Sequence, residues 1–254
     1  MFAVELKFES SGHGSSDAKT DAISWLTAAF VRNGNLMGQF EVEGDEEFVV
    51  YGLTPARNAF HRANWNDRVR QQIGALKSVN LKRPRVRILG LIPETAPICQ
   101  CARPKGYFLF TTFLSVEPPL RCIRCNGVVP LYRVARPTGG EHSELLSWQS
   151  NYQACDTLQM NCTVGQRFGE RQMSDMKSPL SITGLAICNE IQRLTGRPTY
   201  YYLFRASARS HSEEASRRCP TCRGEWLMKK PLHGKFDFKC ERCRLISNIA
   251  WNVR

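Results

Sequence analysis

Two matched cysteine pairs near the C-terminus constrain the fold of this chain more than any other feature. Two residues separate Cys219 from Cys222, two separate Cys240 from Cys243, and 17 residues lie between the pairs. A turn with this spacing directs two thiolates at one ion, and a hairpin between the turns can bring the second pair to complete a tetrahedron. We therefore predict a C-terminal zinc ribbon with a structural Zn²⁺ ion. Four thiolates leave no open position for water, which disfavours hydrolytic zinc chemistry, whereas iron remains open as the metal.

A second set of cysteines lies earlier in the chain. Cys99 and Cys101 precede Cys122 and Cys125 by 20 residues. The later pair has ordinary metal-binding spacing, and the earlier pair is one residue tighter. We predict a second four-cysteine zinc site here. The alternative is that one arm is core cysteine and that no metal binds.

The N-terminus and the number of cysteines indicate a cytoplasmic protein. The first residues alternate in polarity and lack the basic start and apolar block of a signal peptide, and no apolar run is long enough to cross a membrane. Thiols do not persist as structural disulfides in a reducing compartment, so paired cysteines there are better interpreted as metal ligands. The three remaining cysteines, Cys155, Cys162 and Cys188, lie in apolar helical stretches, and we expect buried core thiols.

Residues 1–92 show the order strand, helix, strand, strand, helix, strand. This order is typical of a ferredoxin-like domain, a fold that hosts many functions. The strands are expected at 2–8, 36–43, 48–53 and 85–89, and the helices at 22–30 and 65–76. The turn between the middle strands is expected at 43–46. The first helix has its apolar positions at Ala22, Trp25, Leu26, Ala29 and Phe30, with Gly34 as its stop.

The rest of the chain completes an α+β protein with three predicted parts: residues 1–92, 93–205 and 206–254. The middle region is rich in cysteine, and we expect its strands at 107–113 and 199–204 and its helices at 141–160 and 179–195. Residues 206–218 are expected to form a polar linker into the zinc ribbon, whose third strand is expected at 245–251.

The positive charge is concentrated away from the N-terminal part. The net charge is +12, yet residues 1–80 carry 8 Lys and Arg against 10 Asp and Glu, whereas residues 205–254 carry 12 against 5. A basic surface attracts polyanions, including nucleic acid. The cations of the ribbon are Arg217, Arg218, Arg223, Lys229, Lys230, Lys235, Lys239, Arg242 and Arg244.

Aromatic residues alternate with these cations, and the combination suits single-stranded nucleic acid, because phosphates meet the charges and bases stack on the rings. The rings of the ribbon are Trp226, Phe236 and Phe238. The alternative is that these rings form the ribbon's own core and that its lysines guard an exposed sheet edge. Tyr200, Tyr201 and Tyr202 invite the same stacking interpretation, although alternation along a strand would bury about half of them.

Four motifs occur together between Cys99 and Ser247, within a resemblance that spans nearly the full length of the chain. They are Cys219-Pro-Thr-Cys222…Trp226, Cys240-x-x-Cys243-Arg-Leu-Ile-Ser247, Pro198-Thr-Tyr-Tyr-Tyr-Leu203 and Cys99-x-Cys101…Cys122-x-x-Cys125. Together they resemble a family of bacterial proteins described as containing a zinc ribbon and suspected of binding nucleic acid, a domain of unknown function. The resemblance implies a bacterial cytoplasmic protein with Cys219, Cys222, Cys240 and Cys243 as zinc ligands. The family's turn usually places glycine directly after the second cysteine, where this chain has Arg223, and we expect Gly224 to take the turn instead.

No catalytic motif stands out, and the five histidines form no close pair in the sequence. We therefore expect a non-catalytic protein without catalytic residues, which binds nucleic acid, with RNA or single strands ahead of duplex DNA. The competing hypothesis is a protein-interaction module, or an inhibitor or immunity-type protein, that docks an acidic partner through the same basic face. A hydrolase is the third hypothesis, and its site would have to be assembled from distant residues. The sequence does not indicate the oligomeric state.

Overall fold

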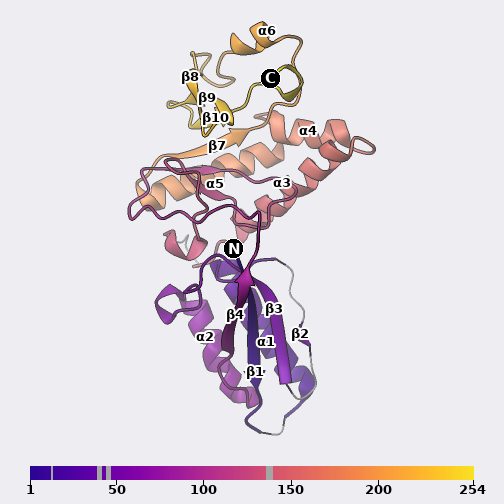
Figure 1. Cartoon of the computed structure of the whole chain (residues 1–254), viewed down its shortest axis with the longest axis vertical. Helices are drawn as coiled ribbons and strands as arrows, with labels where there is room; N and C mark the ends of the chain where they lie inside the picture. The colour runs from indigo at the N-terminus through magenta and orange to yellow at the C-terminus, as the bar shows by residue number, and fades with distance from the viewer. Residues whose placement is uncertain (13, 39–41, 44–46, 136–139) are drawn as a thin grey trace. The chain divides into compact units, whose positions relative to one another are not determined.

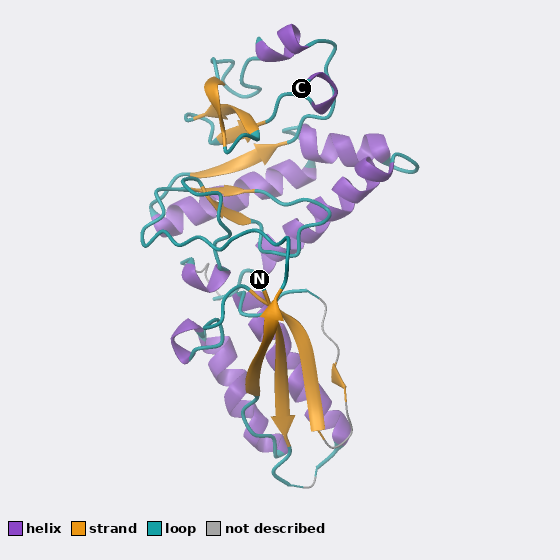
Figure 2. Ribbon diagram, viewed as in Figure 1, coloured by secondary structure: helices purple, strands orange, loops and turns teal. Residues whose placement is uncertain are grey.

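The computed structural model describes the whole chain except residues 13, 39–41, 44–46 and 136–139. It is a mixed α+β protein, as predicted (Figures 1 and 2), and it divides into two compact units. The first unit comprises Met1–Ile98, Val116–Pro118 and Val128–Ser143, and the second comprises Cys99–Ser115, Pro119–Gly127 and Glu144–Arg254. The three-part division of the sequence stays a prediction.

The first unit contains one antiparallel sheet in the order β2-β3-β1-β4. The strands are β1 (Phe2–Glu9), β2 (Val42–Glu43), β3 (Glu47–Thr54) and β4 (Arg85–Leu91), and the helices are α1 (Ser16–Asn33) and α2 (Asp67–Ala75). Short 3₁₀ segments lie at Arg62–Asn64, Leu76–Val79 and Leu131–Arg133. The element order is that of the split βαββαβ arrangement, which confirms the ferredoxin-like prediction for this unit.

The alternation that predicted β1 also determines its packing. Val4, Leu6 and Phe8 are buried in the core beneath the helices, whereas the intervening residues are less covered. Gly34 ends α1 in the left-handed conformation at a φ of 80°, as its position predicted. Of the apolar positions that predicted α1, Leu26, Ala29 and Phe30 are buried, whereas the side chain of Trp25 is 55% exposed.

The second strand is shorter than expected. It was predicted at 36–43, but β2 comprises only Val42–Glu43 among the described residues. Residues 39–41, and residues 44–46 of the predicted turn, lie outside the described part of the chain.

The second unit is built around a six-stranded mixed sheet in the order β6-β5-β7-β10-β9-β8. The strands are β5 (Tyr107–Leu109), β6 (Leu120–Cys122), β7 (Thr199–Leu203), β8 (Leu227–Leu232), β9 (Phe236–Cys240) and β10 (Leu245–Ser247). The helices are α3 (Ser143–Asn161), α4 (Gln166–Ser174), α5 (Pro179–Thr195) and α6 (His211–Ala215), with a final 3₁₀ segment at Trp251–Val253. β7 pairs in parallel with both β5 and β10, so the C-terminal strands extend the sheet of the middle region.

Helix α5 packs against the interior strand β7. A Cβ atom on Gly184 would lie 2.3 Å from the ring of Tyr201, so the close approach requires glycine at this position. The Tyr201 hydroxyl donates to Ser181 Oγ at 3.2 Å. All five residues of β7 are buried. The expectation that half of the tyrosines would be exposed is therefore wrong, because neighbouring elements cover both faces of this strand.

Three other boundaries differ from the prediction. β5 ends at Leu109 rather than at residue 113, and Phe113 N–H donates instead to the Asp156 carboxylate at 2.8 Å. The predicted linker 206–218 contains α6. The third strand of the predicted ribbon ends at Ser247, before the 3₁₀ segment that contains Trp251. Within the described residues, no helix is long and apolar enough to span a bilayer.

Candidate metal centres and a basic surface

The four C-terminal cysteines come together in one cluster. The sulfur atoms of Cys219, Cys222, Cys240 and Cys243 all lie within 4.8 Å of one another, and the Cys222 and Cys240 sulfurs are 3.6 Å apart. A tetrahedral ion bound at about 2.3 Å from each sulfur would place the sulfurs about 3.8 Å apart. The cluster therefore fits a four-coordinate metal ion.

The earlier cysteines form another cluster of the same size, which we call the middle cluster. The sulfurs of Cys99, Cys101, Cys122 and Cys125 lie within 4.8 Å of one another, with 4.0 Å between Cys101 and Cys122. The tighter spacing of the first pair does not prevent convergence. This cluster also could hold a metal ion.

The same backbone turn is built at both sites. In one, Cys219 N–H donates to Gly224 O at 3.0 Å, and Arg223 N–H donates to Cys219 O at 2.9 Å. In the other, Cys122 N–H donates to Gly127 O and Asn126 N–H donates to Cys122 O, both at 2.9 Å. The matching hydrogen bonds indicate that the middle cluster is shaped like the C-terminal one.

The residue after the second cysteine of each turn is left-handed. The φ angles are 60° for Arg223, 59° for Asn126 and 53° for Arg244. Gly224 was expected to take the turn in place of Arg223, and this is wrong, because Arg223 adopts the left-handed conformation itself. A non-glycine residue there costs about 1–2 kcal/mol, so these turns are strained where the chain lacks glycine.

Hydrogen bonds and burial act in opposite directions on the C-terminal thiols. The backbone N–H of Gly224 and the thiol of Cys243 donate to the Cys222 sulfur, and they lower the pKa of Cys222 to about 7. Burial raises the pKa of Cys243 to about 12. One thiolate thus forms readily near neutral pH, and the others need a nearby cation to lose their protons.

In the middle cluster, burial and hydrogen bonds likewise shift the pKa values of the thiols in opposite directions. Burial raises the pKa of Cys99. Burial also acts against ionisation of Cys125, but hydrogen bonds from Gly127 N–H and from the neighbouring thiols outweigh it and lower the pKa of Cys125. A bound dication would lower the pKa values that burial raises at the other thiols, because a coordinating thiol is deprotonated outright.

Four of the predicted nucleic-acid contacts have protein partners. Arg217 is turned inward: its guanidinium lies 4.3 Å from the Phe238 ring centroid and pairs with buried Glu214 at 2.9 Å. Arg218 pairs with Glu225 at 2.8 Å. The other two, Lys239 and Arg244, lie over Tyr200 and pair with Glu241.

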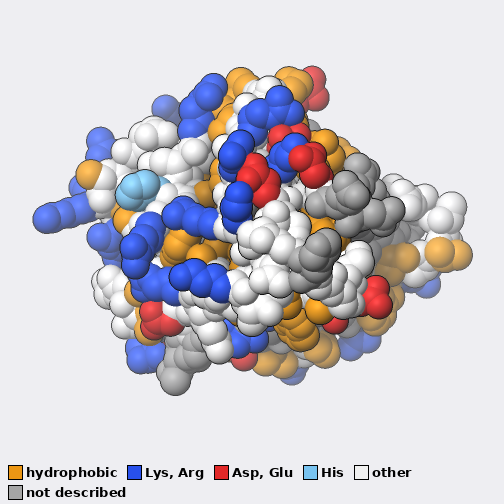
Figure 3. Space-filling model, turned by 90° about the horizontal axis from the view of Figure 1, so that it is seen from below, with side chains coloured by type: hydrophobic (Ala, Val, Ile, Leu, Met, Phe, Trp, Pro, Cys, Tyr) orange, Lys and Arg blue, Asp and Glu red, His pale blue; other side chains and the backbone are white. Residues whose placement is uncertain are grey.

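Five predicted contacts remain exposed and form no ion pair with any described residue. They are Arg223, Lys229, Lys230, Lys235 and Arg242. Two of them lie on β8, the edge strand of the sheet, whose ladder is irregular: Leu227 is opposite Phe238 and Leu232 is opposite Phe236, so residues 228–231 bulge from the ladder. The view from below in Figure 3 shows Lys and Arg side chains that gather among apolar ones, with some Asp and Glu side chains between them; it does not single out the five cations named above.

The aromatic residues predicted to stack on bases are in the core. Trp226, Phe236 and Phe238 are each at most 3% exposed. The structure therefore favours the alternative interpretation, in which these rings form the interior of the C-terminal segment.

The sequence analysis missed further cations beside the middle cluster. Arg103, Lys105 and Arg124 are exposed and have no ion pair within the described part of the chain. The tip of the β8–β9 hairpin reaches the same place, where His233 Nε2 lies 2.9 Å from Ile123 O. His233 thus contacts the turn of the middle cluster and is not a ligand of the C-terminal cluster. The position of these cations within and beside the cysteine motifs was the available signal.

The remaining thiols differ from one another. Cys155 and Cys188 are buried, as predicted, and burial raises the pKa of each. Cys162 was also expected in the core, and this is wrong, because it follows α3 and is exposed.

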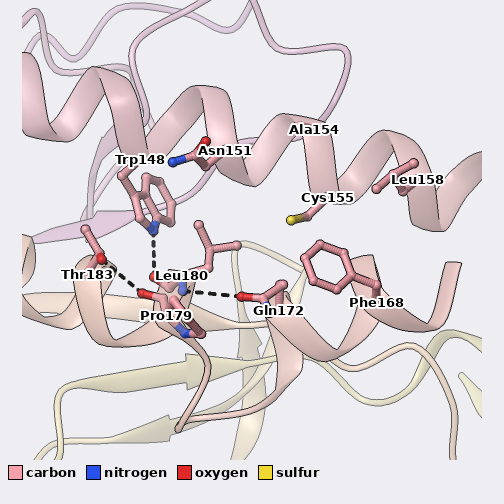
Figure 4. A pocket seen from close by; sticks show the side chains of 10 residues that line it. All are labelled: Trp148, Asn151, Ala154, Cys155, Leu158, Phe168, Gln172, Pro179, Leu180 and Thr183. Carbon is pink, nitrogen blue, oxygen red and sulfur yellow. Dashed lines mark hydrogen bonds between the residues drawn. The ribbon is translucent and has the colours of Figure 1, made fainter. Parts of the chain in front are cut away.

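An apolar cavity of about 330 Å³ lies between α3, α4 and α5 (Figure 4). The Cys155 sulfur, Phe168 and Leu180 line it, and Trp148 Nε1 donates to Leu180 O at 3.1 Å. A protonated thiol without a neighbouring acid or base in this lining is a poor nucleophile. The cavity therefore offers no evident catalytic machinery.

The families and relatives that the chain matches have no described activity. Three family models match the chain, each described as a domain of unknown function: DUF8589 over residues 1–90, DUF2310 over 101–204 and DUF8594 over 208–253. An uncharacterised protein of Haemophilus influenzae is 31% identical over 226 residues, which is 87% of each chain. A second from the same organism is 40% identical over 149 residues, covering 59% of this chain and 73% of the relative.

Solved structures give only distant likenesses. SnoaB, a cofactor-independent oxygenase from Streptomyces nogalater, is 17% identical with a TM-score of 0.28, covering 37% of this chain and all of its own. An antibiotic biosynthesis monooxygenase is 13% identical with a TM-score of 0.27, again over 37% of this chain and 100% of its own. Likenesses at these TM-scores carry no argument about fold or activity.

Proposed function

Since the chain belongs to the same family as the Haemophilus influenzae protein that it matches over 226 residues, and since no activity comes with that family, we propose from the site alone that it binds nucleic acid. The binding is non-catalytic and favours RNA or single strands over duplex DNA. The C-terminal segment is a zinc ribbon in this proposal, and zinc also occupies the middle cluster. Such thiolate sites suit the reducing cytoplasm.

The observation that carries the proposal is the set of five exposed cations without ion pairs to the described residues. Other exposed cations are already paired: in the first unit, Arg87 pairs with Glu5 at 2.8 Å and Lys7 with Glu47 at 2.6 Å. A cation already paired with a carboxylate has less to gain from a phosphate, whereas an unpaired one releases a counterion when a phosphate replaces it. The free cations of the ribbon are therefore available to a polyanion.

Cations from both cysteine sites contribute to this basic surface. The contact between His233 and Ile123 O holds the hairpin tip against the turn of the middle cluster. The hairpin carries Lys229, Lys230 and Lys235, and the turn carries Arg124 next to Ile123. A strand of nucleic acid that follows the hairpin would thus meet charges from both sites.

Zinc has a structural role in the proposal. Four thiolates in a tetrahedron suit Zn²⁺ and leave it no position for a substrate. Binding of the ion contributes about 10–16 kcal/mol in small zinc modules, so the ion fixes the turns that present Arg223 and Arg242. Protein residues alone contact the nucleic acid.

The test compares two double variants of the metal-loaded full chain. Lys229→Ala/Lys230→Ala should weaken binding to single-stranded RNA and reduce the slope of log affinity against log salt by about 1.4, since each phosphate contact contributes about 0.7. Arg62→Ala/Lys77→Ala removes the same charge from exposed positions of the first unit and should change the slope little.

Equal effects of the two variants would show that only net charge matters and would remove the hairpin from the account. If the wild type binds no RNA but retains a protein partner after nuclease treatment of a pull-down, the nucleic-acid proposal fails in favour of the protein-interaction hypothesis.

A further inference from the structure

One aromatic side chain of the C-terminal segment is exposed where the others are buried. Trp251 is 61% exposed, whereas Trp226 and Phe238 are at most 3% exposed. A large apolar ring held in solvent gains nothing from burial in the folded chain. Its exposure leaves the face of the ring accessible to a ligand.

The residues that follow Trp251 are anchored by their side chains. Asn252 Nδ2 donates to Ala208 O and Asn252 Oδ1 accepts from Ala208 N–H, both at 2.9 Å. Arg254 donates to Gly234 O at 2.7 Å and to Lys235 O at 3.1 Å. The exposed ring is thus presented from a fixed backbone, which reduces the entropy that a ligand would have to remove.

Cations lie beside the ring. The Arg254 guanidinium is 5.8 Å from the Trp251 ring centroid, and Asp237, 3.7 Å from Arg254, neutralises part of its charge. Lys235, whose carbonyl Arg254 binds, is exposed, and its ammonium lies 5.8 Å from the ring of half-buried Phe110. The hairpin tip therefore joins two pairs of an aromatic ring and a cation.

We propose that Trp251 stacks on a base of a single-stranded nucleic acid while the unpaired Lys235 contacts the adjacent phosphate. The inference rests on the proposed function and adds to it the position at which a base is held. Stacking on an exposed indole tolerates any base, because every base has a π-face. It also requires an unpaired base, since the bases of a duplex are already stacked on one another.

The experiment measures affinities of the metal-loaded full chain for three fluorescent probes. They are a single RNA strand of about 12 nucleotides, within the site sizes of single-strand binding folds, an abasic strand of the same length, and the duplex. Wild type should bind the base-containing strand tighter than the abasic one. Trp251→Ala should weaken the former about 5-fold to 150-fold and leave the abasic affinity unchanged, and Trp251→Phe should restore most of the loss.

Trp25→Ala is the matched control, because Trp25 is 55% exposed on α1 of the first unit, and it should behave as wild type. Two outcomes overturn the inference while the proposed function stands: the wild type binds both single strands equally, or Trp251→Ala weakens both by the same factor. If the wild type binds no probe, the proposed function fails, and the inference fails with it.

Discussion

Replacing Arg223 with glycine should strengthen metal binding at the C-terminal cluster. Arg223 is held at a φ of 60°, which costs a residue with a side chain about 1–2 kcal/mol and costs glycine nothing. Glycine also loses more freedom on folding, which offsets about 0.5–1 kcal/mol of this gain. The net gain of about 0.5–1 kcal/mol corresponds to a metal dissociation constant about 2-fold to 5-fold lower.

A second arginine of the same cluster provides the control. Arg242 is exposed, lies between Cys240 and Cys243, and its backbone is not left-handed. Arg242→Gly makes the same chemical change and removes the same charge, but it relieves no strain. It should therefore raise the dissociation constant by a similar factor.

Competition with a chromogenic chelator measures both affinities on the full chain. The two variants should move in opposite directions from the wild type. If Arg223→Gly binds metal no more tightly than Arg242→Gly, the backbone strain at position 223 is not a feature of the metal-bound turn, and the reasoning is refuted.

Three further outcomes are expected. Chelation should raise hydrogen exchange in residues 219–247 and leave β1 unchanged, because the ion holds the cysteine turns; uniform exchange along the chain would contradict this. Metal affinity should fall as the pH is lowered, since protons compete for the thiolates, and it should fall more steeply below about pH 7, where Cys222 becomes protonated as well; titrations of affinity at several pH values would show a constant slope if this were wrong. Gly184→Ala should destabilise the second unit by about 1–3 kcal/mol, because its Cβ would lie 2.3 Å from Tyr201, whereas Gly74→Ala, with nothing within 4 Å, should not; denaturant midpoints report both.

Local patterns in the sequence predicted the helices and strands whose periodicity or end signals lie within the element itself. The alternation of β1 and the ends of α5 are examples: Pro179 lies in the first turn of α5, Gly196 is its C-cap, and both elements occur as predicted. The cysteine spacings likewise predicted two clusters, since two ligands of each turn lie within a few residues of each other.

Long-range pairing accounts for what the sequence did not reveal. β7 lies between β5 and β10, which are distant in the chain, and no local period encodes that neighbourhood. The unbroken aromatic run of β7 was the available signal, because a strand covered on both faces lacks alternation. The inward turn of Arg217 depends on Glu214, in a stretch whose polarity suggested a linker. The exposure of Trp251 depends on β10 ending at Ser247.

The measurement that tests the central claim most directly is the affinity of the metal-loaded full chain for single-stranded RNA over a series of salt concentrations. At the two cysteine clusters, eight exposed cations have no ion pair to a described residue: five in the ribbon and three beside the middle cluster. At about 0.7 per phosphate contact, the account predicts that log affinity falls linearly with log salt, with a slope no steeper than about −6. The absence of RNA binding at low salt, or an affinity independent of salt, would contradict it.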